Sequence, residues 1–301
     1  MVQPPASCIR RTQHWITKGV TGLLMIVGTY LPPLYAAEEG TTKAILPSHT
    51  LDVAYYIPSG CTPRALLIVL ASKNRDYRAF RDESIPLAQQ SCSLIVAPYF
   101  PLKTYPPRAY QRGGFPENTT QPSATRLIVP LEQWTQHFAK QDLPIILIGH
   151  SAGAQFLNRV AAYTIGAERG IILMNPGSTV EPTINIAMPY GFAGSWNKDD
   201  ASKALNAYLA RPVIFLLGSK DTKSASFSGD AQADIEGEGT NRLQRGINTY
   251  NAGQNEAQRL KTTFGWHIVI VPGIGHDDAL ILGSPILERT VETLINRGSL
   301  Q

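Results

Sequence analysis

Short runs of consecutive apolar residues recur along the chain and alternate with longer amphipathic stretches. Strands that are buried on both faces of a parallel sheet have this unbroken apolar character, whereas strands with one solvated face alternate apolar and polar residues. The apolar runs that we expect to form strands are 51–57, 65–71, 93–97, 145–148, 170–174, 213–217 and 267–271. The amphipathic stretches that we expect to form helices lie at about 124–140, 152–164, 200–209, 241–261 and 284–297. This alternation predicts an α/β fold with a mostly parallel sheet and helices on both faces.

The most specific local motif directly follows the predicted strand 145–148. Residues 149–153 read Gly-His-Ser-Ala-Gly and precede a predicted helix. Between a strand and a helix, Gly-x-Ser-x-Gly is typical of a nucleophile elbow, a sharp turn that exposes the serine hydroxyl. Gly149 and Gly153 are needed because side chains there would collide with the turn and with the neighbouring strand. The motif predicts that Ser151 is a catalytic nucleophile, with a plain glycine-rich turn as the alternative.

A serine nucleophile needs a general base and a carboxylate that orients the base. Behind an elbow of this kind, the expected order along the chain is serine, then acid, then histidine. His276 lies in a glycine-rich loop after the last predicted strand, and Asp221 follows the strand before it. We therefore predict a catalytic triad of Ser151, Asp221 and His276, with Asp277 or Asp278 as the alternative acid.

Acyl transfer by a serine also needs two backbone N–H groups that hold the oxyanion. Ala152, the residue after the nucleophile, is expected to donate one of them. The other is expected from the loop 71–77, where Lys73 is the first choice and Ser72 the alternative. His150 occupies the variable position of the motif and is expected to be structural or to line the pocket.

The N-terminal residues have the pattern of a secretory signal. Three basic residues and no acidic ones accompany an apolar stretch at 20–30, which is followed by a small-residue site at 34–36. The apolar stretch is shorter than the roughly 20 residues that span a bilayer, so no stable membrane span is expected after the signal is removed. We expect cleavage after Ala36 and an exported, periplasmic or extracellular domain over 37–301. A twin-arginine signal and an uncleaved anchor are the alternatives.

Cys61 and Cys92 are the two cysteines of the expected mature chain. Each lies just before a predicted strand, at 65–71 and 93–97. If these strands are parallel neighbours, both thiols lie at the same end of the sheet, and an exported protein can keep a disulfide. We therefore predict a Cys61–Cys92 disulfide, with two separate buried thiols as the alternative.

The formal charge of +4 belongs mostly to the N-terminal segment. Without the three basic residues of 1–36, the chain holds 24 basic and 23 acidic residues. A nearly neutral body gives no electrostatic reason to bind nucleic acid. The sequence also has no Cys/His cluster with zinc-site spacing and no Gly-x-Gly-x-x-Gly after a strand, so it implies no metal and no organic cofactor.

Two connections between predicted strands are long for a compact domain, at 175–212 and 219–266. Connections of this length often form lids or binding elements. In the first of them, Tyr190, Phe192 and Trp196 are candidates for the walls of a substrate pocket. Ordinary packing of the segment against the sheet is the alternative.

Taken together, these motifs resemble the α/β-hydrolase superfamily, and more narrowly exported esterases related to poly(3-hydroxyalkanoate) depolymerases and feruloyl esterases. The segments that carry the resemblance are 74–75, 97–98, 113–114, 149–156, 189–191, 218–222, 241–242 and 275–277. The resemblance implies a single catalytic domain with a mostly parallel sheet of about eight strands. It also implies that the predicted triad acts on esters. One departure is that Ala71-Ser72 stands where such esterases usually carry His-Gly.

The function that we expect is hydrolysis of a small-molecule or oligomeric carboxylic ester by acyl transfer. A peptidase or amidase is the first alternative, because the same triad can attack an amide carbonyl. A catalytically inactive hydrolase-fold binding module is the second. The sequence leaves the oligomeric state open.

Overall fold

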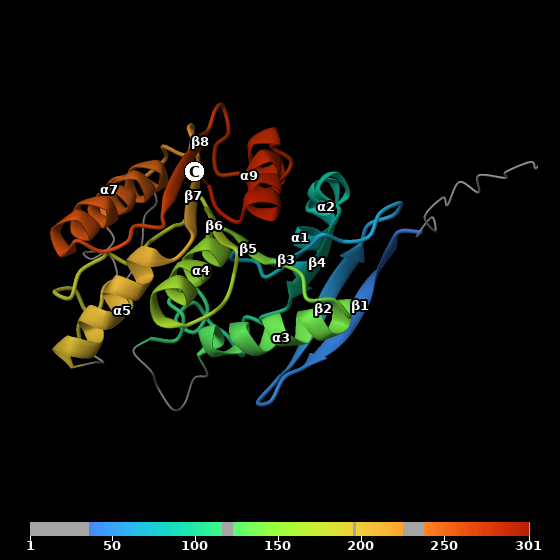
Figure 1. Ribbon diagram of the computed structural model, residues 1–301, viewed down its shortest axis with the longest axis horizontal. Coiled ribbons are helices and arrows are strands. Elements are labelled where there is room, and N and C mark those ends of the chain that lie inside the picture. Colours follow the sequence, from blue (N-terminus) through green and yellow to red (C-terminus); the bar gives the residue numbers. More distant parts are fainter. Residues whose placement is uncertain (1–35, 116–122, 195–196, 225–237, 301) are drawn as a thin grey trace, which may run out of the picture. The chain divides into compact units, whose positions relative to one another are not determined.

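A computed structural model describes residues 36–115, 123–194, 197–224 and 238–300 and contains an eight-stranded sheet (Figure 1). The strands are β1 (Glu38–Ile45), β2 (Thr50–Ile57), β3 (Ala65–Leu70), β4 (Ser93–Pro98), β5 (Ile145–His150), β6 (Gly170–Met174), β7 (Val213–Gly218) and β8 (His267–Val271). They are ordered β1-β2-β4-β3-β5-β6-β7-β8. Of these strands β2 alone runs against the others, because it pairs antiparallel with β1 and β4 while the remaining pairs are parallel. The predicted mostly parallel sheet is confirmed.

Helices cover both faces of this sheet (Figure 1). They are α1 (Tyr77–Glu83), α2 (Ile85–Ser91), the 3-10 turn η1 (Ala124–Leu127), α3 (Ile128–Ala139), α4 (Ala152–Tyr163), α5 (Lys198–Ala210), α7 (Arg242–Leu260), α8 (Asp278–Leu282) and α9 (Pro285–Arg297). One hydrophobic core lies between the sheet and α3, α4, α5 and α7, and a second lies between the sheet and α1, α2, α8 and α9.

Strand β3 shows why the central strands consist almost wholly of apolar residues. Leu66, Ile68 and Leu70 belong to the first core, and Leu67 and Val69 belong to the second. Because successive side chains of a strand point to opposite faces, every position of β3 is buried. The unbroken apolar runs in the sequence are thus the strands that have helices on both sides.

Cys61 and Cys92 form a disulfide, with their Cα atoms 6.2 Å apart. Strands β3 and β4 pair in parallel with Ala65 opposite Ser93, so the two cysteines that precede them meet at the amino end of the strands. The predicted pairing is therefore present. The bridge closes a loop over a sequence separation of 31 residues, and a cross-link of this length stabilises a fold by about 3–4 kcal/mol in the chain-entropy account.

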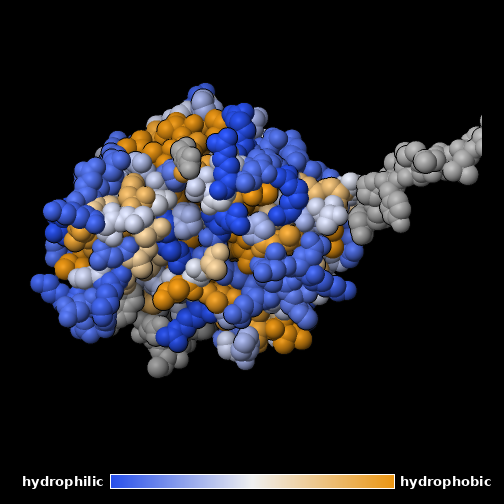
Figure 2. Space-filling model, viewed as in Figure 1, coloured by the Kyte–Doolittle hydropathy of each residue, from blue (hydrophilic) through white to orange (hydrophobic). Residues whose placement is uncertain are grey.

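The surface has few large exposed apolar side chains. Figure 2 shows apolar patches separated by hydrophilic residues on the face that it presents. Among the described residues the large apolar side chains with high exposure are Ile45, Leu102, Ile165, Ile270 and Leu280. No helix in the described ranges combines the length and the apolar character that a bilayer crossing requires. The predicted signal over 1–36 lies almost wholly outside the described residues.

Candidate active site

Ser151 lies at the turn between β5 and α4, with φ 52° and ψ −108°. A positive φ is rare for a residue with a side chain, and such conformations concentrate at functional sites. The turn is tight on both sides. A Cβ at Gly149 would lie 2.5 Å from the carbonyl carbon of Gly153, and a Cβ at Gly153 would lie 2.2 Å from the carbonyl oxygen of Leu70. Both glycines are therefore required by close backbone contacts around Ser151.

The loops after β5, β7 and β8 bring the three predicted triad residues together. His276 Nε2 lies 3.0 Å from Ser151 Oγ, and His276 Nδ1 lies 2.8 Å from Asp221 Oδ2. Asp221 is 2% exposed, whereas the His276 side chain is 28% exposed. A carboxylate beside Nδ1 favours the tautomer with the proton on Nδ1, which leaves Nε2 as an acceptor. The arrangement can accept the proton of the serine hydroxyl.

Arg242 supports the carboxylate of Asp221 from the other side. Its Nη1 donates to Asp221 Oδ1 across 3.4 Å, and the backbone N–H of Leu243 donates to the carbonyl oxygen of Asp221. Arg242 begins α7, so this helix contributes to the site through its first turn. Arg242 is not among the site residues predicted from the sequence, because nothing in the pattern shows that the start of this helix adjoins β7.

Asn175 joins the two loops that carry the acid and the base. Its Nδ2 donates to the Gly275 carbonyl oxygen across 3.0 Å, and its Oδ1 accepts the Gly218 N–H at 2.8 Å. Asn175 directly follows β6 and has φ 48°, a conformation that asparagine tolerates better than most residues. Sequence reasoning missed it, although an asparagine immediately after a buried strand is a signal for such a turn.

The imidazole of His150 lies next to that of His276. The rings of His150 and His276 have centroids 4.7 Å apart. His150 is 2% exposed, and its Nδ1 lies 3.0 Å from Ser72 Oγ. Burial, and next the charge of His276, lower the pKa of His150 to about 3, so this ring is neutral at neutral pH. His150 is thus buried beside the site and adds no positive charge to it.

The two alternative acids have other contacts. Asp277 Oδ1 accepts the N–H of Leu280 and caps α8. Asp278 Oδ2 accepts the hydroxyl of Ser72 across 3.3 Å. Asp221 is the carboxylate that is hydrogen-bonded to His276.

The loop 71–77 borders the elbow, as an oxyanion hole requires. A Cβ at Gly153 would lie 3.0 Å from the Ala71 carbonyl oxygen, so the loop directly contacts the first turn of α4. Ala152 is the first residue of α4, where backbone N–H groups have no acceptor within the helix. Lys73 lies in the turn that the Arg75 N–H closes onto Ser72 O at 3.0 Å. The roles of Ala152 and Lys73 as oxyanion donors stay predictions.

Two of the predicted pocket-wall residues are packed in the interior. Phe192 is fully buried, and its ring centroid lies 5.6 Å from that of Tyr163 and 5.7 Å from that of Tyr208. Tyr190 is 6% exposed and lies against the guanidinium of Arg159, 5.4 Å from the ring centroid. These contacts pack the segment against α4 and α5, as the alternative of ordinary packing expects. A role of Tyr190 and Phe192 as pocket walls stays a prediction.

The third candidate wall, Trp196, lies outside the described residues. The two long connections, 175–212 and 219–266, contain α5 and α7. Whether their remaining parts act as lids stays a prediction.

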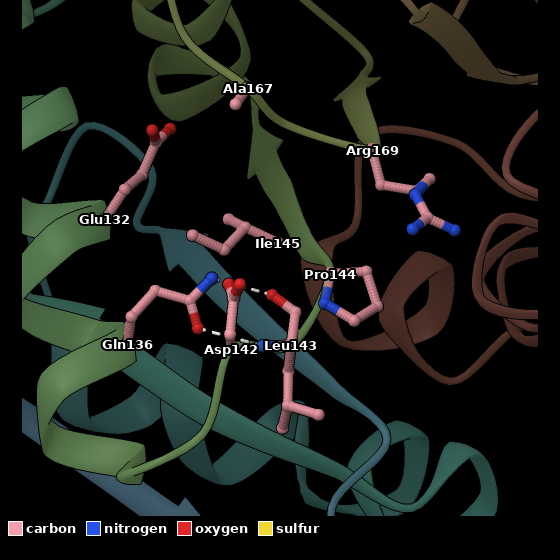
Figure 3. A pocket seen from close by; sticks show the side chains of 8 residues that line it. All are labelled: Glu132, Gln136, Asp142, Leu143, Pro144, Ile145, Ala167 and Arg169. Carbon is pink, nitrogen blue, oxygen red and sulfur yellow. Dashed lines mark hydrogen bonds between the residues drawn. The ribbon is translucent and has the colours of Figure 1, made fainter.

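A pocket of about 310 Å³ lies beside α3 and the segments that precede β5 and β6. Figure 3 shows the residues around it. It is lined by Glu132, Gln136, Asp142, Leu143, Pro144, Ile145, Ala167 and Arg169. Two hydrogen bonds between the Gln136 amide and the Leu143 backbone, 2.7 and 3.0 Å long, cross its lower part. The lining residues Asp142, Leu143, Pro144, Ala167 and Arg169 lie just before β5 and β6, whereas the predicted triad residues come after the carboxyl ends of β5, β7 and β8. Since these strands are parallel, the pocket and the triad lie at opposite ends of the sheet.

Within the described part of the chain, no group of three or more His, Cys, Asp or Glu side chains is arranged to hold a metal ion.

The sheet order, the strand–elbow–helix unit and the loops that carry an acid and a histidine define the α/β-hydrolase fold, and this chain has that fold. No protein-family model and no curated protein sequence matches it. Among solved structures it is similar to LpqC, a poly(3-hydroxybutyrate) depolymerase from Bordetella parapertussis, with TM-score 0.74 and 26% identity over 88% of this chain and 92% of that one. It is also similar to poly(aspartic acid) hydrolase-1 from Sphingomonas sp. KT-1, with TM-score 0.73 and 24% identity over 83% and 97% of the two chains.

Proposed function

We propose that this chain is a serine hydrolase that cleaves carboxylic esters. The observation that carries the proposal is the hydrogen-bonded line from Asp221 through His276 to Ser151, with contacts of 2.8 and 3.0 Å. The positive φ of Ser151 supports the same role, because strained backbone at a buried strand end is typical of a nucleophile elbow. The similarity to LpqC supports an ester as the bond that is cleaved, because poly(3-hydroxybutyrate) is a polyester.

In the first step, Ser151 Oγ attacks the ester carbonyl carbon while His276 Nε2 takes the hydroxyl proton. Asp221 stabilises the imidazolium that forms, since its carboxylate faces Nδ1. The carbonyl oxygen becomes an oxyanion, which the N–H groups of Ala152 and Lys73 would stabilise. When the intermediate collapses, the bond to the alcohol oxygen breaks and that oxygen takes the proton from Nε2. An acyl ester on Ser151 remains.

In the second step, water attacks the acyl ester with His276 as general base. Water gives a proton to Nε2, and the same proton returns to Ser151 Oγ as the carboxylic acid leaves. All groups that move protons in this cycle are side chains of the chain itself. The cycle needs no cofactor.

We also propose that the protein is exported. The Cys61–Cys92 disulfide supports this, because disulfides persist in oxidising compartments. The signal pattern of residues 1–36 supports it independently. Mass determination of the mature protein, with and without reductant, tests both: cleavage near Ala36 and two thiols released only by reductant are expected.

The test of the activity is hydrolysis of p-nitrophenyl esters, from acetate to palmitate, by the purified protein and by a Ser151→Ala variant. We expect turnover that falls at least about 10⁴-fold in the variant, because the nucleophile is lost. The chain-length profile then sizes the acyl pocket. A matched p-nitroanilide separates esterase from amidase activity. Retained turnover in Ser151→Ala would exclude this mechanism, and absence of both turnover and fluorophosphonate labelling would favour a binding module.

A further inference from the structure

The loop 71–77 contains a buried arginine. Arg75 is 3% exposed, and its Nη1 donates to the carbonyl oxygens of Ser72 at 3.3 Å and Lys73 at 3.0 Å. Its Nε and Nη2 are also buried and have no hydrogen-bond partner among the described residues. The hydrogen bonds of this guanidinium are therefore made to the backbone of the loop.

Tyr110 contacts both the Arg75 guanidinium and the backbone of the loop 71–77. The Arg75 guanidinium lies 3.8 Å from the centroid of the Tyr110 ring, and the Tyr110 hydroxyl donates to the Ala71 carbonyl oxygen at 2.8 Å. The ring of Tyr110 is stacked on Phe156 of α4, with centroids 4.9 Å apart. The arginine–tyrosine stack is thus fixed to the helix that begins at Ser151.

These contacts orient three successive peptide groups. The carbonyl oxygens of Ala71, Ser72 and Lys73 all point to the stack. In a trans peptide the N–H of the following residue points opposite to the carbonyl. The N–H groups of Ser72, Lys73 and Asn74 therefore point away from the stack. Successive N–H groups with a common direction form a concavity that binds anions.

A buried guanidinium without a carboxylate partner is costly for a fold. Burial is the main cause that lowers the pKa of Arg75, and the Tyr110 ring is its neighbour in place of an acid. A buried charge that no opposite charge compensates is destabilising, so packing alone does not account for an arginine at this position. Arg75 is accounted for if its hydrogen bonds are needed to fix the direction of the loop carbonyls.

We propose that Arg75 and Tyr110 are positioning residues that aim the N–H groups of Lys73 and Asn74 at the oxyanion formed on Ser151. The inference rests on the proposed serine hydrolase activity. It adds Asn74 to the predicted donors. The proposal also explains how a loop with Ala71-Ser72 in place of His-Gly keeps its N–H groups oriented. The side chains of Arg75 and Tyr110 fix the loop carbonyls, and the peptide planes then fix the N–H groups.

The test compares Arg75→Lys and Tyr110→Phe with a matched control, Arg211→Lys. Arg211 is another largely buried arginine that donates to a backbone carbonyl, that of Thr164 at 2.8 Å, at the opposite end of the sheet. The readouts are kcat and KM for p-nitrophenyl acetate, the rate constant for fluorophosphonate labelling of Ser151, and the Tm.

Arg75→Lys keeps the charge but loses the planar guanidinium that stacks on Tyr110 and holds Nη1 against the two carbonyl oxygens. We expect it to lower kcat and the labelling rate about 10- to 100-fold with KM within about twofold, because misplacing an oxyanion donor costs transition-state stabilisation. Tyr110→Phe, which loses one hydrogen bond, is expected to lower kcat about fivefold. Arg211→Lys is expected to leave kcat within about twofold.

An Arg75→Lys variant with unchanged kcat, or with a raised KM alone, would overturn the positioning role while leaving the triad intact. If Arg75→Lys does not fold, Tyr110→Phe decides, and unchanged kcat in that variant overturns the proposal. Failure of the unmodified protein both to hydrolyse esters and to be labelled at Ser151 would overturn the proposed function and this inference together.

Discussion

At the scale of single residues, two imidazoles lie side by side in different environments. His276 is partly exposed and faces Ser151 and Asp221, whereas His150 is buried and faces Ser72. Because His150 stays neutral, it fills the space behind the proposed base without repelling the imidazolium that forms during acylation. The two rings share a residue type, but burial gives them different chemistry.

The lowered pKa of His150 predicts a pH dependence of stability. Its folded pKa of about 3 lies below the unfolded value of 6.5, so the unfolded chain binds the proton more readily. The contribution of neutral His150 to the free energy of unfolding is complete above pH 6.5 and is lost as the pH falls toward 3. The free energy of unfolding falls by at most about 1.4 kcal/mol per pH unit in this range. Urea unfolding of the protein and of His150→Gln at several pH values checks this. The difference between the two free energies of unfolding is expected to shrink on acidification, and parallel curves would contradict it.

Sequence patterns identified some residues of the site and missed others for a physical reason. Ser151 and Asp221 follow fully buried strands, and His276 follows the apolar edge strand β8. Because parallel strands end at the same edge of a sheet, local pattern and topology place the three residues together. Asn175 and Arg75 act through hydrogen bonds to backbone groups of distant or turned segments. Such bonds depend on tertiary geometry, which no local pattern records.

At the scale of secondary-structure elements, the apolar runs predicted β2 to β8 with ends shifted by at most two residues. Strand β1 was missed because its sequence, Glu-Glu-Gly-Thr-Thr-Lys-Ala-Ile, is mostly exposed at the sheet edge and has no apolar run. Helices α1, α2 and α8 were missed because each has only five to seven residues, too few to show a helical period. The sequence pattern therefore revealed strands through their apolar residues, and it missed an exposed strand that has few of them.

Asn175 connects β6 to the loops after β7 and β8, so its substitution tests how elements hold the site. Asn175→Ala removes both hydrogen bonds and leaves at φ 48° a residue that tolerates this conformation less well than asparagine, whereas Asn175→Gly removes the bonds without that strain. We expect both variants to lower kcat about 10- to 100-fold, because Asp221 and His276 lose their common support.

The matched control for Asn175 is Asn197→Ala. Asn197 caps α5 by accepting the N–H of Asp200 at 2.9 Å, and loss of a cap costs about 1 kcal/mol of stability. This variant is expected to lower the Tm while kcat stays unchanged. Equal kcat in Asn175→Gly and the unmodified protein would show that the loops hold their geometry without Asn175.

At the scale of the described domain, the two ends of the sheet have different roles. The carboxyl ends of β5, β7 and β8 lead to the proposed triad. The amino ends of β3 and β4 adjoin the disulfide, and those of β5 and β6 adjoin the pocket beside Glu132. Glu132 is buried next to Glu168, whose carboxylate is paired with Arg211 at 2.5 Å. Burial, and next the Glu168 carboxyl, raise the pKa of Glu132 to about 9.

The raised pKa of Glu132 predicts that stability falls with rising pH, which is the opposite of the pH dependence predicted for His150. A folded pKa above the unfolded value of 4.5 means that the contribution of Glu132 to stability is complete below pH 4.5 and is lost as the pH rises toward 9. Glu132→Gln is expected to raise the free energy of unfolding at pH 8 relative to the unmodified protein and to change it least at pH 5. Chemical unfolding at both pH values measures the difference. Since the triad is at the other end of the sheet, kcat is expected to stay the same.

The position of the disulfide has a practical consequence. Cys61 and Cys92 join chain segments at the amino ends of β3 and β4, away from the loops that carry Ser151, Asp221 and His276. A covalent attachment made near that end, to a bead or an electrode, would leave the proposed active site facing the solution. Immobilisation through this end is therefore expected to preserve turnover, whereas attachment through the loops at the opposite end is expected to block it.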